Sequence, residues 1–150
     1  MAPDHVVLTQ TADFSWPVRV YYEDTDAGGV VFYANYLKFF ERARTEWLRA
    51  LGVHQHDLLQ SHGVVFVVKS SSIDYHAPAR LDDELSITVA VEKLGRASVQ
   101  FLQQTWRMNG EKRLLTSAQV KVVCVEGASF RPSPIPDNVL NILQSPAAQA

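Results

Sequence analysis

The sequence has one cysteine, no long apolar run and almost no excess of charge of either sign. Because Cys124 is the only cysteine among 150 residues, no disulfide can form within the chain. The longest strongly apolar runs are residues 64–68 and 122–125, far below the ~20 residues that a membrane-spanning helix needs. Lys and Arg number 14 and Asp and Glu 16, so the net charge is −2. That balance argues against a protein that coats nucleic acid.

Export signals, cofactor loops and the common nucleophile motifs are absent too. Residues 1–13 hold no Lys or Arg and no long apolar core, so they do not resemble a secretory signal, and we expect a cytoplasmic protein. The chain contains no phosphate-binding loop, dinucleotide fingerprint or G-x-S-x-G elbow, and we expect no cofactor. Cys124 lies in a valine run, where an inert buried thiol is expected. A cluster of polar residues surrounds the predicted short helix and consists of His54, His56, Asp57 and His62. Its spacing matches no strong zinc pattern, so a solvated surface is favoured over a metal site.

Length and composition indicate one globular domain. The chain is 47% hydrophobic and 20% charged, near the average of such domains, and it is long enough to bury a core without a metal or a disulfide. We expect an N-terminal arm over residues 1–13, a single domain over residues 14–144 and a C-terminal tail over residues 145–150.

Hydrophobic periodicity predicts one long helix early in the chain. Alternating residues predict a first strand over residues 16–23. Apolar residues at spacings of three and four then predict an amphipathic helix over residues 34–51, ended by Gly52. A short helix is expected over residues 55–62, ended by Gly63.

The rest of the chain is predicted to be mostly strands. Residues 97–108 are rich in β-formers but irregular in phase, which suggests a bulge. Asn109-Gly110 is a strong hairpin signal, and Pro136 is placed to open a last short helix. Short turns join antiparallel neighbours. The predicted fold class is therefore α+β, with a curved antiparallel sheet around one long helix.

The most unusual segment joins the first strand to the long helix. It carries Asp24 and Asp26 just before a Gly28-Gly29 turn. In one interpretation, a carboxylate forms an Asx turn or a helix cap. In the other, a carboxylate beside the helix N-terminus acts as base or nucleophile, while helix N–H groups bind a developing oxyanion. We expect only one of the two carboxylates to face a site.

Three motifs carry a resemblance to a known family. They are SWPVRVYYEDTDAGGVV at residues 15–31, FERARTE at residues 40–46 and YHAPARLDD at residues 75–83. They resemble YbgC-type acyl-CoA thioesterases, in the hotdog-fold 4-hydroxybenzoyl-CoA thioesterase family of bacteria, and the similarity spans residues 14–143. The resemblance implies a five-stranded antiparallel sheet wrapped around the helix and assembly into homodimers or homotetramers. It also implies hydrolysis of an acyl-CoA thioester at a site between two chains.

The resemblance also implies roles for particular residues. Asp26 is implied to be the catalytic carboxylate, as base or nucleophile on the thioester carbonyl, whereas Asp24 is structural. The backbone N–H of Tyr33 and its neighbours is implied to bind the oxyanion. YbgC-type chains usually have His at this position, and the hydroxybenzoyl-CoA branch has Tyr. A phenol, with a pKa of about 10 in water, is no base near neutral pH, but the backbone N–H survives the change.

Residues that contact the substrate are implied less directly. Coenzyme A carries phosphates, which Arg or Lys side chains bind. The family contacts the nucleotide end from a turn that corresponds to Arg96 and Ser98, and Arg80 is a further candidate; a solvated surface position is the alternative for both arginines. Tyr22 either lines the site or packs within its strand.

Two other functions are weighed against hydrolysis. The first is a protein that binds acyl-CoA or acyl carrier protein without hydrolysis, as a partner of envelope or lipid-synthesis machinery. The reason to consider it is Tyr33, which stands where YbgC-type chains usually have His. YbgC-type proteins are associated with the Tol-Pal envelope system and with phospholipid synthesis. A purely structural hotdog subunit is the third candidate, and the intact Asp26 and Gly-Gly turn count against it.

Overall fold

The computed structural model describes residues 5–7 and 14–145, and the strands in this part of the chain form one antiparallel sheet. The strands are β1 (His5–Val7), β2 (Phe14–Arg19), β3 (Val64–Tyr75), β4 (Glu84–Gly95), β5 (Ser98–Arg107) and β6 (Arg113–Glu126). Their order is β1-β4-β5-β6-β3, and β2 also pairs with β4. β1 lies along the end of β4 and β2 along its beginning. The sheet therefore has five strand positions, as predicted, and the two short strands share one of them.

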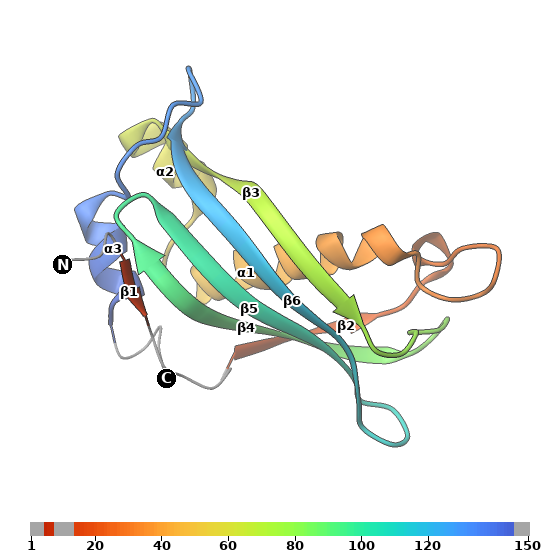
Figure 1. Cartoon of the computed structure of the whole chain (residues 1–150). Helices are drawn as coiled ribbons and strands as arrows, with labels where there is room; N and C mark the ends of the chain where they lie inside the picture. Colours follow the sequence, from red (N-terminus) through yellow and green to blue (C-terminus); the bar gives the residue numbers. More distant parts are fainter. Residues whose placement is uncertain (1–4, 8–13, 146–150) are drawn as a thin grey trace.

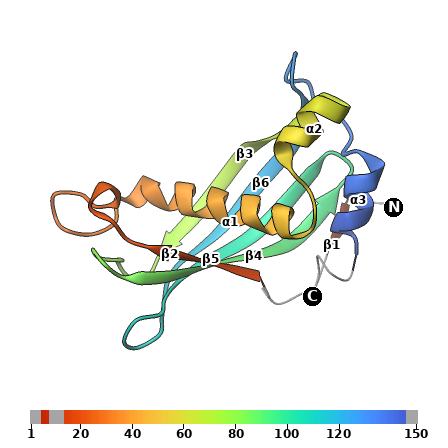
Figure 2. The ribbon, with the colours of Figure 1, turned by 180° about the vertical axis from the view of Figure 1, so that it is seen from behind.

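The long helix α1 (Tyr36–Ala50) lies along the concave face of the sheet, which curves around it (Figures 1 and 2). Phe39, Phe40 and Ala43 on its inner side are fully buried, and full burial of each phenylalanine ring contributes roughly 1.5–3 kcal/mol. Farther along the helix, the Trp47 ring meets Phe101 of β5 edge-on, with centroids 5.5 Å apart. The predicted α+β fold is confirmed, because the apolar stripe of one helix forms the core with one face of the sheet.

Glycines and a proline end or begin the helices as predicted. Gly52 follows α1 with a φ of 86°, and Gly63 follows α2 (Gln55–His62) with a φ of 68°. These left-handed conformations suit glycine, which has no Cβ to clash. α3 (Asp137–Leu143) begins directly after Pro136.

The strand connections are also close to the prediction. The β5–β6 turn contains Asn109 and Gly110, and Gly110 has a φ of 66°. The irregular phase of residues 97–108 has its counterpart in a shift of the pairing register between Thr105 and Trp106. A bulge inserts an extra residue into one strand, so the side chains beyond it point to the opposite faces of the sheet from those that strict alternation predicts.

The predicted first strand is too long. β2 ends at Arg19, and Tyr22–Asp24 form a 3₁₀ turn, η1. The Asp24 carboxylate accepts the backbone N–H of Tyr21 at 2.9 Å, which offers the backbone a partner other than a neighbouring strand. This local bond stops the sheet although the alternating pattern of side chains continues.

Most of the predicted arm (residues 1–13) and of the predicted tail (residues 145–150) lies outside the described residues. Within the arm, His5–Val7 form β1 and pair with the end of β4. In the described part of the chain, no helix combines the length and the apolar character needed to cross a membrane.

Candidate active site

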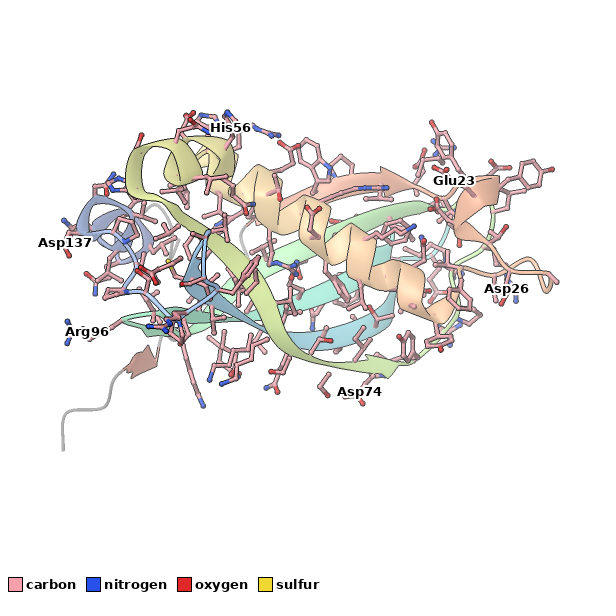
Figure 3. All side chains as sticks on the ribbon, turned by 90° about the horizontal axis from the view of Figure 1, so that it is seen from above. Glu23, Asp26, His56, Asp74, Arg96 and Asp137 are labelled. Carbon is pink, nitrogen blue, oxygen red and sulfur yellow. The ribbon has the colours of Figure 1, made fainter. Side chains whose placement is uncertain are left out.

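The segment between β2 and α1, residues 20–35, forms a loop at one end of the sheet, and Asp26 lies near its tip (Figure 3). An antiparallel bridge between Thr25 and Val31 holds the two arms of this loop side by side. We call it the catalytic loop, after the role that the family resemblance implies for Asp26. The backbone N–H of Asp26 donates to the carbonyl of Val30 at 2.9 Å. The loop therefore places Asp26, on its first arm, near its second arm, which leads into α1.

Asp24 braces the base of the catalytic loop. Its side chain is buried, and Oδ1 accepts a hydrogen bond of 2.9 Å from Nδ2 of Asn35. Its own carbonyl accepts the N–H of Phe32 at 3.0 Å. Both contacts lead to the helix entrance, so Asp24 has the structural role that the resemblance implies.

Asp26 is exposed, and the two oxygens of its carboxylate differ in their contacts. Oδ1 accepts the backbone N–H of Gly28 at 2.8 Å and that of Val30 at 3.4 Å, which is the arrangement of an Asx turn. No hydrogen bond or ion pair is formed by Oδ2 within the described residues. One oxygen therefore fixes the carboxylate, and the other is left to accept a proton or to attack a carbonyl carbon.

The two glycines of the loop serve different purposes. A Cβ on Gly28 would lie 3.2 Å from Oδ1 of Asp26, closer than side chains usually pack. Gly29 has a φ of 79°, a left-handed conformation that other residues adopt only with strain. Gly28 thus leaves room for the carboxylate, and Gly29 lets the chain turn back.

The helix entrance begins with a 3₁₀ turn, η2 (Tyr33–Asn35), that runs directly into α1. Within the described residues, the backbone N–H groups of Tyr33 and Ala34 have no acceptor. Unpaired N–H groups at a helix start carry partial positive charge and favour anions. They are available donors for an oxyanion, and Tyr33 is the residue predicted to supply one.

Tyr75 holds the helix entrance from the last position of β3. Its hydroxyl donates to the carbonyl of Tyr33 at 2.7 Å, and its ring meets the buried Tyr36 edge-on at 5.6 Å. Burial raises the pKa of both phenols, so they stay protonated donors well above neutral pH. Tyr75 is a supporting residue that sequence reasoning did not single out, although it opens the third family motif.

The predicted packing alternative for Tyr22 does not hold. Tyr22 lies in η1 rather than in a strand, and its side chain is 81% exposed. It belongs to a group of exposed aromatic side chains on the catalytic loop, with exposed fractions between 46% and 81%, that comprises Tyr21, Tyr22, Phe32 and Tyr33. These rings are free to contact a substrate or a second chain.

The predicted phosphate-binding residues fall in two places. Arg80 is exposed, and its backbone forms a bridge with Val30, so it lies beside the catalytic loop. Arg96 and Ser98 lie at the β4–β5 turn, and Figure 3 shows Arg96 at the opposite end of the molecule from Asp26. A single chain therefore does not bring Arg96 to Asp26.

The histidines and Cys124 are the other side chains weighed for chemistry. Among the described residues, no three His, Cys, Asp or Glu side chains are grouped so that they could hold a metal ion. Cys124 is fully buried, and burial raises the pKa of its thiol to about 11. Such a thiol stays protonated and is a poor nucleophile.

Comparison with known proteins identifies the family. The family described as the thioesterase-like superfamily matches residues 20–143. The acyl-CoA thioester hydrolase YbgC of Escherichia coli O157:H7 is 46% identical over 133 residues, which cover 87% of this chain and 95% of the relative. The acyl-CoA thioesterase YbgC of Haemophilus influenzae is 48% identical over 126 residues, covering 84% of this chain and 90% of the relative.

A solved structure supports the fold. A 4-hydroxybenzoyl-CoA thioesterase variant in complex with 4-hydroxybenzoyl-CoA matches with a TM-score of 0.80 over 86% of this chain and 96% of that one. At 20% sequence identity this likeness concerns the fold alone, and it confirms the predicted hotdog architecture. From the extent of the family match and the identity to its curated members, the chain belongs to the YbgC family of acyl-CoA thioesterases within the thioesterase-like superfamily.

Proposed function

We propose that the chain hydrolyses an acyl-CoA thioester to the free acid and coenzyme A, with Asp26 as the catalytic carboxylate. The observation that carries the proposal is the asymmetry of this side chain. Gly28 N–H holds Oδ1 at 2.8 Å, while Oδ2 has no partner within the described residues. Family membership supports the activity, because the similar E. coli and H. influenzae proteins are named as acyl-CoA thioester hydrolases.

The helix entrance is the proposed oxyanion site. As the carbonyl carbon is attacked, negative charge builds on its oxygen, and the unpaired N–H groups of Tyr33 and Ala34 offer donors for it. Loss of one such donor typically costs about 2.7–4 kcal/mol of barrier. The Tyr33 side chain has no part in this role, so the tyrosine that replaces the usual histidine is compatible with activity.

Two chemical routes fit the free oxygen of Asp26. The carboxylate attacks the thioester carbon directly, coenzyme A leaves as the thiolate, and water then cleaves the mixed anhydride. In the other route, the carboxylate takes a proton from a water molecule that attacks the same carbon. Both routes consume one water and release one acid and one thiol.

The complete site is proposed to need two copies of the chain. Asp26 and Arg96 lie at opposite ends of one molecule (Figure 3). β3 lies at an edge of the sheet, and residues 68–72 in its middle are exposed. If two copies pair antiparallel along this edge, the end of one chain that carries Arg96 and Ser98 lies toward the catalytic loop of the other. Arg80, beside the catalytic loop, and Tyr22 on it are proposed as contacts from the first chain.

The family resemblance carries the remaining proposals. We place the protein in the cytoplasm. The choice between dimer and tetramer, and a link to the Tol-Pal system or to phospholipid synthesis, stay predictions.

Release of free thiol from a panel of aliphatic and aromatic acyl-CoA substrates tests the proposal. The wild-type protein is expected to hydrolyse at least one of them, and Asp26→Asn is expected to lose at least about 100-fold in kcat. Glu23→Gln is the matched control, because Glu23 is an exposed carboxylate on the same loop that forms no hydrogen bond to the loop backbone within the described residues. Unchanged hydrolysis by Asp26→Asn would refute the role of this carboxylate.

A second candidate function is binding without hydrolysis. The observation that favours it is Tyr33, whose exposed phenol stands where YbgC-type chains usually have histidine. Tight binding of acyl-CoA by the wild-type protein, with no thiol released from any substrate of the panel, would establish this function in place of the enzyme.

A further inference from the structure

A groove lies on the convex face of the sheet, opposite to the face that α1 covers. Its volume is about 630 Å³, within the range of about 300–1,000 Å³ that is typical of small-molecule sites. Ser117 points into it, because the side chains of its neighbours Thr116 and Ala118 are buried in the core on the other face. Its lining comes mostly from β4, β5 and β6 and includes Thr88, Leu102, Gln104, Trp106, Met108 and Ser117.

The Ser117 hydroxyl is hydrogen-bonded to a histidine. Its Oγ lies 3.1 Å from Nε2 of His76. His76 directly follows the last residue of β3, and its backbone N–H donates to the carbonyl of Leu115 at 2.7 Å, so the chain that carries the imidazole is held beside β6. A serine hydroxyl within hydrogen-bond reach of a neutral imidazole can pass its proton to that base, which turns the oxygen into a nucleophile.

Two further polar groups flank Ser117 on the same face. Asp74 of β3 and Gln104 of β5 are its direct partners in the register of the sheet. Directly opposite residues share a face, with Cβ atoms about 4.5–5.5 Å apart. Asp74 also precedes His76 by two residues, so its negative charge stabilises the positive charge that the imidazole gains when it takes a proton.

The Gln104 amide is oriented with its nitrogen free. Oε1 accepts a hydrogen bond of 3.1 Å from Nε1 of Trp106. Because an indole nitrogen only donates, this bond fixes which end of the carboxamide carries the oxygen. Nε2 has no acceptor within the described residues. Its N–H groups are therefore available to an oxyanion, which a side-chain amide can stabilise in acyl transfer.

We propose that Ser117, His76 and Gln104 form a second hydrolytic site, which cleaves small carboxylic esters bound in the convex-face groove. Ser117 Oγ attacks the carbonyl carbon and passes its proton to Nε2 of His76, while the carbonyl oxygen accepts a bond from Nε2 of Gln104. The ester C–O bond then breaks, and the alcohol leaves with the proton from His76. Water hydrolyses the acyl-serine with the same base, so one ester and one water give one acid and one alcohol.

The proposed ester site is separate from Asp26 and from the sheet edge proposed for pairing. Ser117 and Gln104 lie on β6 and β5, which are interior strands of the sheet. Pairing along the edge of β3 uses backbone groups and leaves the side chains of the convex face exposed. Figure 3 shows Asp74 on β3 and Asp26 on the catalytic loop at separate positions. The proposal therefore stands whether or not Asp26 hydrolyses thioesters.

Hydrolysis of p-nitrophenyl acetate, followed by the release of p-nitrophenolate, tests the site. Wild-type protein is expected to show saturable hydrolysis, and Ser117→Ala and His76→Gln should each lose at least about 100-fold in kcat/KM. Ser72→Ala is the matched control, because Ser72 is an exposed serine of β3 on the same face. Unchanged hydrolysis by Ser117→Ala would overturn the proposal. So would absence of hydrolysis by wild type, including absence because another copy covers the convex face.

Gln104→Glu tests the oxyanion donor. The substitution keeps an oxygen for the Trp106 N–H and removes the free amide nitrogen. It is expected to lower kcat for p-nitrophenyl acetate at least about 100-fold, while KM changes little because the groove keeps its shape. Equal kcat in Gln104→Glu and wild type would contradict the proposed constellation.

Covalent labelling tests the nucleophile without turnover. Diisopropyl fluorophosphate reacts with an activated serine: Oγ bonds to phosphorus, fluoride leaves, and the serine proton passes through the base to solvent. Mass spectrometry is expected to find the adduct on Ser117, and to find at least about tenfold less of it in His76→Gln. His56→Gln, which changes an exposed histidine of α2, should be labelled like wild type. No adduct, or an adduct only on another serine, would overturn the proposal.

Discussion

Oδ1 of Asp24 accepts a hydrogen bond of 2.9 Å from Nδ2 of Asn35, and both residues are buried. Eleven residues separate them, so the bond closes the catalytic loop at its base, where the chain turns into η2 and α1. Oδ2 of Asp26 and the N–H of Tyr33, neither of which has a partner within the described residues, both belong to the segment that this bond encloses. Their relative position therefore depends on a pair that has no chemical step of its own.

Asn35→Ala is expected to destabilise the protein by about 1.5–3 kcal/mol, because it leaves a buried carboxylate oxygen of Asp24 without a partner. Urea denaturation measures the change in the free energy of unfolding. Glu23→Gln, on the exposed side of the same loop, should stay within about 0.5 kcal/mol of wild type. An Asn35→Ala variant as stable as Glu23→Gln would show that the bond does not hold the loop.

Tyr75→Phe is expected to lower kcat several-fold while it costs only about 0.5–1.5 kcal/mol of stability. It removes the 2.7 Å bond to the Tyr33 carbonyl but keeps the ring against Tyr36, so the helix entrance loses its anchor and the core does not. Steady-state kinetics and thermal unfolding measure the two effects. Tyr21→Phe is the control, since Tyr21 is an exposed tyrosine of the same loop; equal kcat in both variants would exclude the anchoring role.

Cys124 is expected to make stability fall at alkaline pH. Burial raises the pKa of its thiol from 9.0 to about 11 in the folded chain, so the folded state keeps a proton that the unfolded state has lost. The stabilisation is complete below pH 9 and declines as the pH rises toward 11, with a slope of at most about 1.4 kcal/mol per pH unit.

Urea unfolding at several pH values between 8 and 11 checks this expectation. Cys124→Ala is expected to be less stable than wild type at pH 8, because it leaves a small cavity, but to lose stability less steeply above pH 9. Titration of Tyr36 and Tyr75, whose pKa values are also raised, affects both proteins equally. Parallel stability curves for the two proteins would contradict a raised thiol pKa.

Mixed oligomers test whether two chains share a site. Asp26→Asn and Arg96→Gln are each expected to have a low kcat/KM. When equal amounts are refolded together, half of the dimers contain one chain of each kind, and one of their two sites is intact. Activity should therefore return to about a quarter of the wild-type value. A mixture no more active than the mean of its two components would show that Arg96 of one chain does not serve the site of another.

Most helices and strands could be predicted from residues close together in the sequence. The predictions failed where a side-chain contact, invisible to the hydrophobic pattern, decides the structure. Gly52 and Gly63 follow their helices with a positive φ. Glycine adopts this conformation without strain whatever its surroundings, so these helix ends can be predicted from the sequence. Tyr22 was expected in a strand, but the Asp24 side chain captures the Tyr21 N–H and turns the chain out of the sheet. Alternation of apolar residues carries no information about such a side-chain bond.

The candidate site was predictable in part for the same reason. Asp26, the glycine turn and the helix entrance are neighbours in the sequence, so one motif contains them. The Tyr75 hydroxyl reaches Tyr33 across 42 residues, and its contact follows from how β3 ends beside the helix entrance. Arg96 is the opposite case, because only the family resemblance suggested its role, and within one chain the fold places it far from Asp26 (Figure 3).

Single-turnover hydrolysis by Asp26→Asn, at a protein concentration that binds all of the acyl-CoA, tests the catalytic role of this carboxylate most directly. The substitution keeps the size of the side chain and an oxygen for the Gly28 N–H, so acyl-CoA affinity should change only a few-fold. We predict that the rate of thiol release falls at least about 100-fold relative to wild type and to Glu23→Gln. A rate within threefold of wild type, with acyl-CoA fully bound, would contradict the account.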